Sequence, residues 1–173
     1  AGTGGGTFNL NGKSETLDQL KAAGDGVIGM NQGGTVDAKG LKVTMVPAMH
    51  SSGDLLGHET PLYLGSPVGF VVELENGFRF YHAGDTTAFG DMRLIGELYG
   101  PELAILPIGG HFTMGPREAA LAVELLGARH VMPIHYGTFP ILAGSPDALR
   151  SELKARGLGR VEVHAPEPGG SVS

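Results

Sequence analysis

The order of apolar and polar positions divides the chain into a first part made of strands and a later part in which helices and strands alternate. In the later part, continuous apolar runs at Leu103–Ile108 and Val131–Ile134 predict buried strands. A last strand is predicted at Val161–His164. Amphipathic segments between these runs predict helices that pack on the strands.

Three helices are expected in this part, and each has a start and a stop signal. Asp91 caps the first, with Leu94, Ile95 and Leu98 facing inward and Gly100-Pro101 as its end. The second begins at Gly115-Pro116 and ends at Gly127, and its buried residues are expected to be Ala119, Ala120, Val123 and Leu126. The third covers Pro146–Arg156, with Ser145 as its cap.

The first part of the chain reads as strands and turns. Leu41–Pro47 alternates, with Leu41, Val43 and Met45 expected on the buried face and Lys42 and Thr44 on the other, after a hairpin connection at Asp37–Gly40. Gly69–Leu74 and Phe78–Tyr81 are predicted to pair through Glu75-Asn76-Gly77, which carries the Asn-Gly signal of a type I′ hairpin. Strands early and alternation late predict an α+β fold with helices on a mixed sheet.

The opening of the chain gives weaker signals. Residues 1–6 are glycine-rich and are interpreted as a flexible leader. A short helix is expected next, with Ser14 or Thr16 as its cap and Gly24 as its stop. Residues 51–68 form a long predicted loop, and loops of this length are usually functional or mobile. We expect a single domain over residues 1–173.

Composition narrows the range of functions. A length of 173 residues with 41% hydrophobic residues suits one globular domain with a sizeable core. The net charge of −6 disfavours partners such as nucleic acid or an anionic membrane surface. With no cysteine, a metal would have to bind His, Asp or Glu. No targeting or membrane-spanning segment is recognisable, so cytoplasmic is the default expectation.

The candidate metal-binding residues lie where the apolar runs end. His50, His111 and His135 each follow such a run, and Asp85 sits at the tip of a tight Ala-Gly turn after another. If these strands end at one sheet edge, three imidazoles and a carboxylate meet there, which suits a metal ion such as zinc. His82, just before the turn, is expected to orient a ligand by hydrogen bonding.

The remaining histidines fit ordinary roles. His58 lies in a polar loop beside a glutamate, His130 lies at a helix-to-strand corner, and His164 lies near the end of the chain. We expect each of these three to be a surface or hydrogen-bonded side chain.

Four segments together resemble consecutive motifs of the metallo-β-lactamase superfamily. The similarity is greatest to bacterial metal-dependent hydrolases related to sugar-acid phosphate lactonases and N-acyl-phosphatidylethanolamine phospholipases D. It runs from about Gly29 to Phe139 and weakens beyond; residues 1–28 match poorly. The segments are Val46–Ser52, Tyr81–Thr86, Leu106–Pro116 and Pro133–Phe139.

The resemblance implies an αββα sandwich that holds two divalent metal ions, zinc first and manganese or iron as alternatives. In this superfamily the residue matching His50 binds one metal, that matching Asp85 bridges both, and that matching His135 binds the second. A metal-bridging hydroxide would attack an ester, lactone or phosphodiester of a small-molecule substrate. Asp85 and His111 are the expected catalytic residues. Thr86, Gly109, Gly110 and Tyr136, with His82, are expected to support the ligands or face the substrate.

One motif of the superfamily is missing. The signature His-x-His-x-Asp-His, which would supply further ligands to both metals, occurs nowhere in the sequence. The chain therefore resembles a C-terminal portion, with a sandwich incomplete at its N-terminal side. The partner expected from this is an N-terminal fragment or second chain carrying that motif, or a second copy in a homo-oligomer.

Two classes of function stay open. One is a metal-dependent hydrolase or the larger piece of one. The other is a catalytically inactive, metal-free remnant that binds a ligand or partner through the same cleft. Nuclease activity, also found in this superfamily, is disfavoured by the acidic balance.

Overall fold

The computed structural model describes residues 7–10, 13–16, 35–38, 40–55, 57 and 59–171. The chain divides into two compact units, residues 1–31 and 32–173. In the first unit, β1 (Thr7–Leu10) pairs antiparallel with β2 (Lys13–Thr16). Ser14 lies inside β2, so the prediction that it caps a helix was wrong. The predicted leader at residues 1–6 and the rest of the predicted helix, residues 17–24, lie outside the described residues.

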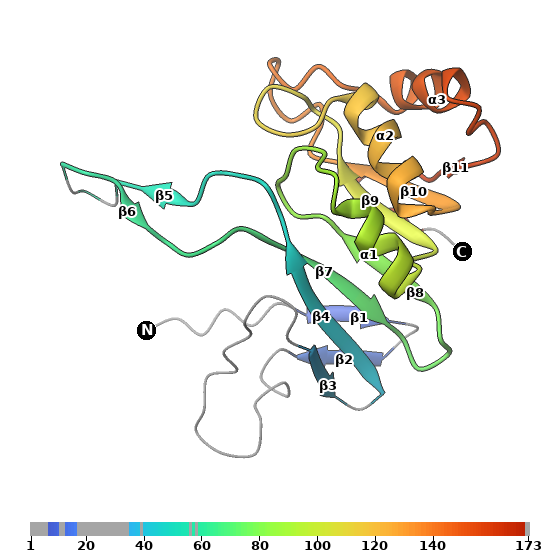
Figure 1. The fold of residues 1–173 in the computed structure, drawn as a ribbon, viewed down its shortest axis with the longest axis horizontal. Helices are drawn as coiled ribbons and strands as arrows, with labels where there is room; N and C mark the ends of the chain where they lie inside the picture. Colours follow the sequence, from blue (N-terminus) through green and yellow to red (C-terminus); the bar gives the residue numbers. More distant parts are fainter. Residues whose placement is uncertain are drawn as a thin grey trace. The chain divides into compact units, whose positions relative to one another are not determined.

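The second unit is built on a seven-stranded mixed sheet with the order β11-β10-β9-β8-β7-β4-β3 (Figure 1). Strands β3, β4, β7 and β8 pair antiparallel, and β8, β9, β10 and β11 pair parallel. The strands are β3 (Thr35–Ala38), β4 (Leu41–Pro47), β7 (Val68–Glu73), β8 (Arg79–His82), β9 (Leu103–Pro107), β10 (His130–Ile134) and β11 (Glu162–Val163). This arrangement confirms the predicted α+β class and mixed sheet.

The long segment between β4 and β7 contains a small ribbon of its own. Strands β5 (Gly53–Asp54) and β6 (Leu62–Tyr63) pair antiparallel and extend away from the main sheet (Figure 1). The sequence had predicted only a loop here, because runs of two residues carry no alternation to detect.

One face of the sheet carries the buried side chains of the core, and the other is only half-buried. In β4 the buried residues are Thr44 and Val46, while Leu41, Val43 and Met45 are half-buried. The predicted facing of this strand was therefore wrong. Thr44 pairs with Val71, whose own side chain belongs to the core, so strand register rather than polarity decides which face turns inward.

The hairpin between β7 and β8 forms, but with a different turn. Leu74 and Phe78 are joined by a backbone hydrogen bond of 2.9 Å, so three residues rather than two form the loop. A type I′ turn needs positive φ at both central positions. Gly77 has φ of 82°, whereas Asn76 is not among the described residues with positive φ; its Oδ1 instead accepts a hydrogen bond from the Phe78 amide. The predicted turn type was wrong.

Three helices cover the buried face along the parallel half of the sheet (Figure 1). They are α1 (Met92–Tyr99), α2 (Pro116–Leu126) and α3 (Pro146–Ala155). The expected inward face of α2 and the Ser145 cap of α3 are confirmed; Ser145 Oγ accepts a hydrogen bond from the Ala148 amide. In the described chain no helix is long and apolar enough to cross a membrane.

Helix α1 buries only one of the three residues predicted to face inward, Ile95. Met92 and Ile95 are buried, whereas Leu94 and Leu98 are 46% and 72% exposed. The cause is a close approach at Gly96: an added Cβ there would lie 2.6 Å from the Leu126 carbonyl oxygen. Gly96 thus fixes the packed side of α1, which a count of apolar residues overlooks.

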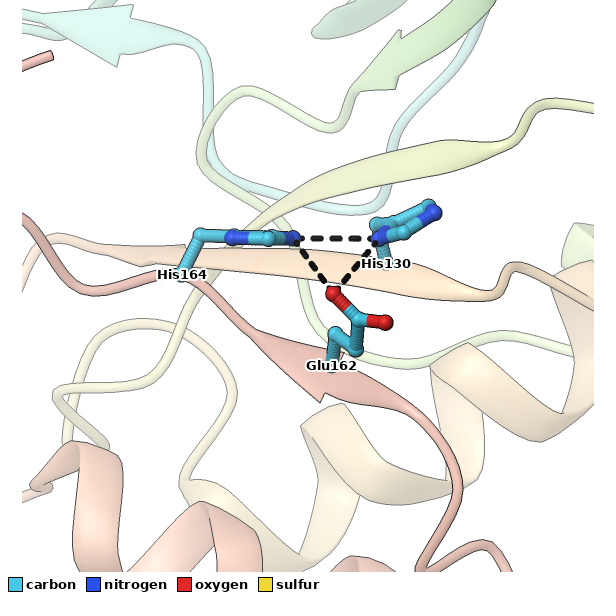
Figure 2. Close-up of side chains that lie close together, drawn as sticks. All are labelled: His130, Glu162 and His164. Atoms are coloured by element: carbon cyan, nitrogen blue, oxygen red, sulfur yellow. Dashed lines mark hydrogen bonds and ion pairs between the residues drawn. The ribbon is translucent and has the colours of Figure 1, made fainter. Parts of the chain in front are cut away.

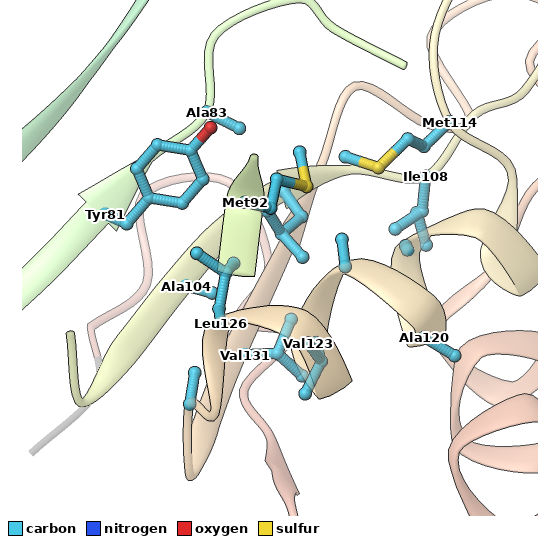
Figure 3. Close-up of a cluster of buried hydrophobic side chains, with 14 of the residues drawn as sticks. Tyr81, Ala83, Met92, Ala104, Ile108, Met114, Ala120, Val123, Leu126 and Val131 are labelled. Carbon is cyan, nitrogen blue, oxygen red and sulfur yellow. The ribbon is translucent and has the colours of Figure 1, made fainter. Parts of the chain in front are cut away.

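Tyr81 belongs to the buried core, in the same cluster as Ala104, Met92 and Leu126 (Figure 3). Its side chain is fully buried, and its hydroxyl has no hydrogen-bond partner in the part of the chain that the structure describes. Burial raises the pKa of the Tyr81 hydroxyl well above its usual range. The phenol therefore stays neutral, and its unpaired polar atom lowers the stability of the fold.

Replacing Tyr81 with phenylalanine is expected to raise the free energy of unfolding by about 1 kcal/mol, because the ring stays and the unpaired hydroxyl is removed. Urea unfolding measures the change. Tyr63→Phe is the matched control, since that hydroxyl is exposed and bonds Ser66; its effect should stay within about 0.5 kcal/mol. Destabilisation by Tyr81→Phe would mean that the hydroxyl has a partner.

Candidate metal centre

The four loops that carry candidate ligands all begin at the same end of the sheet, where strands β4, β8, β9 and β10 finish; this end is called the site edge below. Strands β8, β9 and β10 are parallel, so the loops at their carboxyl ends lie side by side. Strand β4 is antiparallel to β7, which is antiparallel to β8, so β4 also ends at the site edge. Asp85 follows β8, His111 follows β9, His135 follows β10 and His50 follows β4.

Asp85 and His135 face one another at the site edge. Asp85 Oδ2 and His135 Nε2 are 3.7 Å apart, and the side chains are 51% and 28% exposed. This distance is too long for a hydrogen bond. It is close to the separation of about 3.3 Å between two donor atoms that share one tetrahedral zinc ion. Both atoms are open enough for an ion to reach.

Thr86, next to Asp85, joins three of the loops. Its side chain is fully buried, and Oγ1 accepts a hydrogen bond of 2.9 Å from the Met49 amide while donating one of 2.8 Å to the Thr87 carbonyl. Its own carbonyl accepts a hydrogen bond from the Met114 amide. The Thr87 amide also donates a hydrogen bond to the Met49 carbonyl. The loops of His50, Asp85 and His111 are therefore held together by one buried residue.

The position of His50 is fixed by the hydrogen bonds that its neighbour Met49 makes with Thr86 and Thr87. Its Nδ1 lies 3.0 Å from the Ser51 carbonyl oxygen, to which it donates because a carbonyl only accepts. This leaves the Nε2 lone pair free, the arrangement usual for a metal-binding histidine. The donor atoms of His50, Asp85 and His135 do not all lie within 4.8 Å of one another. Among the described residues, only His130, Glu162 and His164 form a group of three potential ligands that close together. In this arrangement the side chains of His50, Asp85 and His135 therefore do not surround a single ion.

The glycines before His111 let its loop pass close to His135. A Cβ on Gly109 would collide with the His135 carbonyl oxygen, and Gly110 has φ of 77°. His111 and His135 themselves have φ of 59° and 55°, the only described non-glycine residues with positive φ. Such strain persists only where surrounding contacts impose it, and it clusters at functional sites.

His82 and Tyr136 lie beside the site rather than in it. The Gly84 amide donates a hydrogen bond to His82 Nδ1, which shapes the turn that presents Asp85. Burial lowers the pKa of His82, so this imidazole is neutral at pH 7 despite the nearby Asp85 carboxylate. Tyr136 packs against the hydrophobic core. His111 is exposed, and its ring meets that of Phe112 edge to face.

The structure also brings together two histidines for which the sequence predicted only ordinary roles. His130 and His164 lie beside Glu162 at the other end of the sheet (Figure 2). Their grouping depends on β11 pairing with β10, which a sequence separation of 34 residues does not reveal. His58 lies outside the described residues.

The comparison with protein families identifies the fold. Residues 9–136 match the family model described as "Beta-lactamase superfamily domain". The match begins upstream of the boundary near Gly29 that the motifs had suggested, and it includes all four candidate residues, His50, Asp85, His111 and His135.

Relatives and solved structures agree with this match. The chain is 54% identical over 140 residues to a metal-dependent hydrolase of Rubrobacter xylanophilus, covering 81% of this chain and 57% of that protein. It is 48% identical over 157 residues to one of Korarchaeum cryptofilum, covering 91% and 65%. A metallo hydrolase from the archaeon Ignicoccus hospitalis superposes with a TM-score of 0.70 at 40% identity, covering 84% of this chain and 59% of that one. The chain thus spans about three fifths of these relatives' length.

Thr86→Val should lower the free energy of unfolding by about 1–3 kcal/mol, because the shape is kept while the Met49 amide loses its acceptor. Urea unfolding measures this. Thr87→Val is the matched control, because Thr87 is exposed and pairs with Met49 only through its backbone. Equal effects of the two substitutions would refute the role given to the Thr86 hydroxyl.

Proposed function

The chain belongs to the β-lactamase superfamily domain family, and from this premise we propose that it acts as a metal-dependent hydrolase or as the larger part of one. The observation that carries the proposal is the Asp85–His135 pair, 3.7 Å apart at the site edge, where four loops converge. Relatives named metal-dependent hydrolases support the same activity.

The donors suit two divalent cations. His50 would bind one, His135 the other, and Asp85 would lie between them. Nitrogen and carboxylate donors without thiolates favour zinc, with manganese or iron as alternatives. Bound at the site edge, the cations would activate water for attack at neutral pH and polarise the substrate oxygen.

The chain's own residues would prepare the site. The Asp85 carboxylate supplies the negative charge that allows two cations to lie close together. The His82 imidazole accepts a hydrogen bond from the Gly84 amide and so fixes the turn that leads into Asp85. His111, exposed on its glycine loop, can donate a hydrogen bond or a proton to the leaving group.

The proposed substrates are small esters, lactones or phosphodiesters with an apolar portion. Three large apolar side chains lie exposed in the site loops: Met49 (56%), Phe112 (60%) and Phe139 (63%). Met49 and Phe112 directly adjoin His50 and His111. Exposed side chains of this kind favour contact with the apolar part of a substrate.

We also propose that further ligands come from a segment or chain carrying His-x-His-x-Asp-His. Three donors are too few for two ions, each of which takes about four ligands. The half-buried face of the sheet, which carries Val43, Phe70 and Ile105, offers the apolar surface for such a companion. A second copy of this chain would cover the same face.

The second candidate is a non-catalytic piece that only binds a partner. The same half-buried face favours it, since that surface needs no metal. Metal content separates the two functions, because only the hydrolase requires close to two ions for each site.

Asp85→Asn in the complete, metal-loaded enzyme should lower kcat/KM for ester or phosphodiester substrates by more than about 100-fold, because an amide lacks the charge that offsets two cations. Asp147→Asn, the same change at an exposed position on α3, should leave activity unchanged. Hydrolysis of a panel of chromogenic esters, lactones and phosphodiesters measures both. Equal activities of the two variants would remove Asp85 from the centre.

The proposed companion is tested by native mass spectrometry of the purified protein with metal analysis. We expect an assembly heavier than the 17.9 kDa chain, with about two metal ions for each site. A fully active monomer of this chain alone with two tightly bound ions would contradict the need for a companion.

A further inference from the structure

A group of three potential ligands lies on the half-buried face of the sheet, where β10 and β11 begin. His130 Nδ1, Glu162 Oε2 and His164 Nε2 all lie within 4.8 Å of one another and point toward a common centre (Figure 2). We propose that these three side chains form a second metal site, which binds a divalent cation of the zinc class.

The spacing of the donor atoms fits one ion. His130 Nδ1 lies 3.0 Å from His164 Nε2, and Glu162 Oε2 lies 3.7 and 3.9 Å from these two nitrogens. Two donors of a tetrahedral zinc ion, each at about 2.0–2.1 Å, lie about 3.3 Å apart. The observed distances bracket that value, so side-chain shifts of a few tenths of an ångström would complete the triangle. A water molecule would supply the fourth ligand.

The donor types select the cation. Two imidazoles with one carboxylate favour zinc and its neighbours over magnesium or calcium, which prefer oxygen ligands alone. The carboxylate also compensates part of the ion's charge. The side chains of His130, Glu162 and His164 are 35%, 67% and 23% exposed, so an ion can enter from solvent.

The backbone holds the ligands in register. His130 lies opposite Glu162 in the parallel pairing of β10 with β11. The Glu162 amide donates to the Arg129 carbonyl, and the His164 amide donates to the Val131 carbonyl at 2.9 Å. These bonds hold Glu162 and His164 beside His130, so little ordering is needed when the ion binds.

This site is separate from the candidate centre. His130 is the first residue of β10 and His135 follows its last residue, Ile134, so the length of the strand, roughly 13 Å, lies between the two. Since β11 pairs with β10 through only two residue pairs, an ion here would cross-link the last strand to the sheet. The inference stands independently of the proposed hydrolase activity.

Zinc binding to the purified protein tests the proposal. We would dialyse the protein to equilibrium against micromolar zinc chloride at pH 7.5 and measure bound zinc by elemental analysis. The double variant His130→Gln/His164→Gln should bind one zinc ion per chain fewer than the unchanged protein. Glu162→Gln should raise the dissociation constant of that zinc ion by about 10-fold or more, since it removes the charge. Glu167→Gln, the same change at an exposed position five residues later, is the matched control and should retain it.

A second measurement on the unchanged protein needs no variant. Zinc should slow hydrogen exchange at the amides of Glu162 and His164, which tie β11 to the sheet. Equal zinc content in the double variant and the unchanged protein, or exchange at these two amides unaffected by saturating zinc, would overturn the proposal. The three side chains would then form only a hydrogen-bonded group.

Discussion

The buried hydroxyl of Thr86 is the interaction on which the geometry of the candidate centre depends. A hydroxyl removed from water must be hydrogen-bonded, and Thr86 uses both roles of its oxygen: it accepts from the Met49 amide and donates to the Thr87 carbonyl. Because Met114 also bonds its carbonyl, movement of one loop would break bonds in the others. The sheet brings the four loops together at the carboxyl ends of the strands, and Thr86 sets the spacing of those that carry His50, Asp85 and His111.

Around this residue, two of the candidate site residues have strained backbone conformations. His111 and His135 adopt left-handed backbone conformations that glycine would adopt more easily. The loop before His111 passes so close to His135 that only glycine fits at position 109. Such strain is maintained by the surrounding core, where Leu106, Ile108 and Val131 are fully buried. Stability from the core thus supports a site that is locally unfavourable.

Much of the framework could be predicted from the sequence because its signals are local. The boundaries of β4, β9 and α2 and the cap at Ser145 follow from apolar runs and from proline, glycine and serine at element ends. What could not be predicted depends on neighbours distant in the chain. Thr44 is buried through its pairing with Val71, and Leu98 is exposed because Gly96 packs against Leu126. His130 and His164 meet only because β11 pairs with β10. For the candidate centre, the sequence predicted the loops that converge, but the hydrogen bonds of Thr86 that set their spacing required coordinates.

The central claim is that Asp85 and His135 hold a metal ion between them. Anomalous diffraction at the zinc edge, from zinc-loaded crystals of the protein together with any chain that completes the site, tests it most directly. We expect a peak within about 2.0–2.2 Å of both Asp85 Oδ2 and His135 Nε2. A zinc-loaded crystal with no peak between these two atoms, and with their 3.7 Å separation unchanged, would contradict the claim.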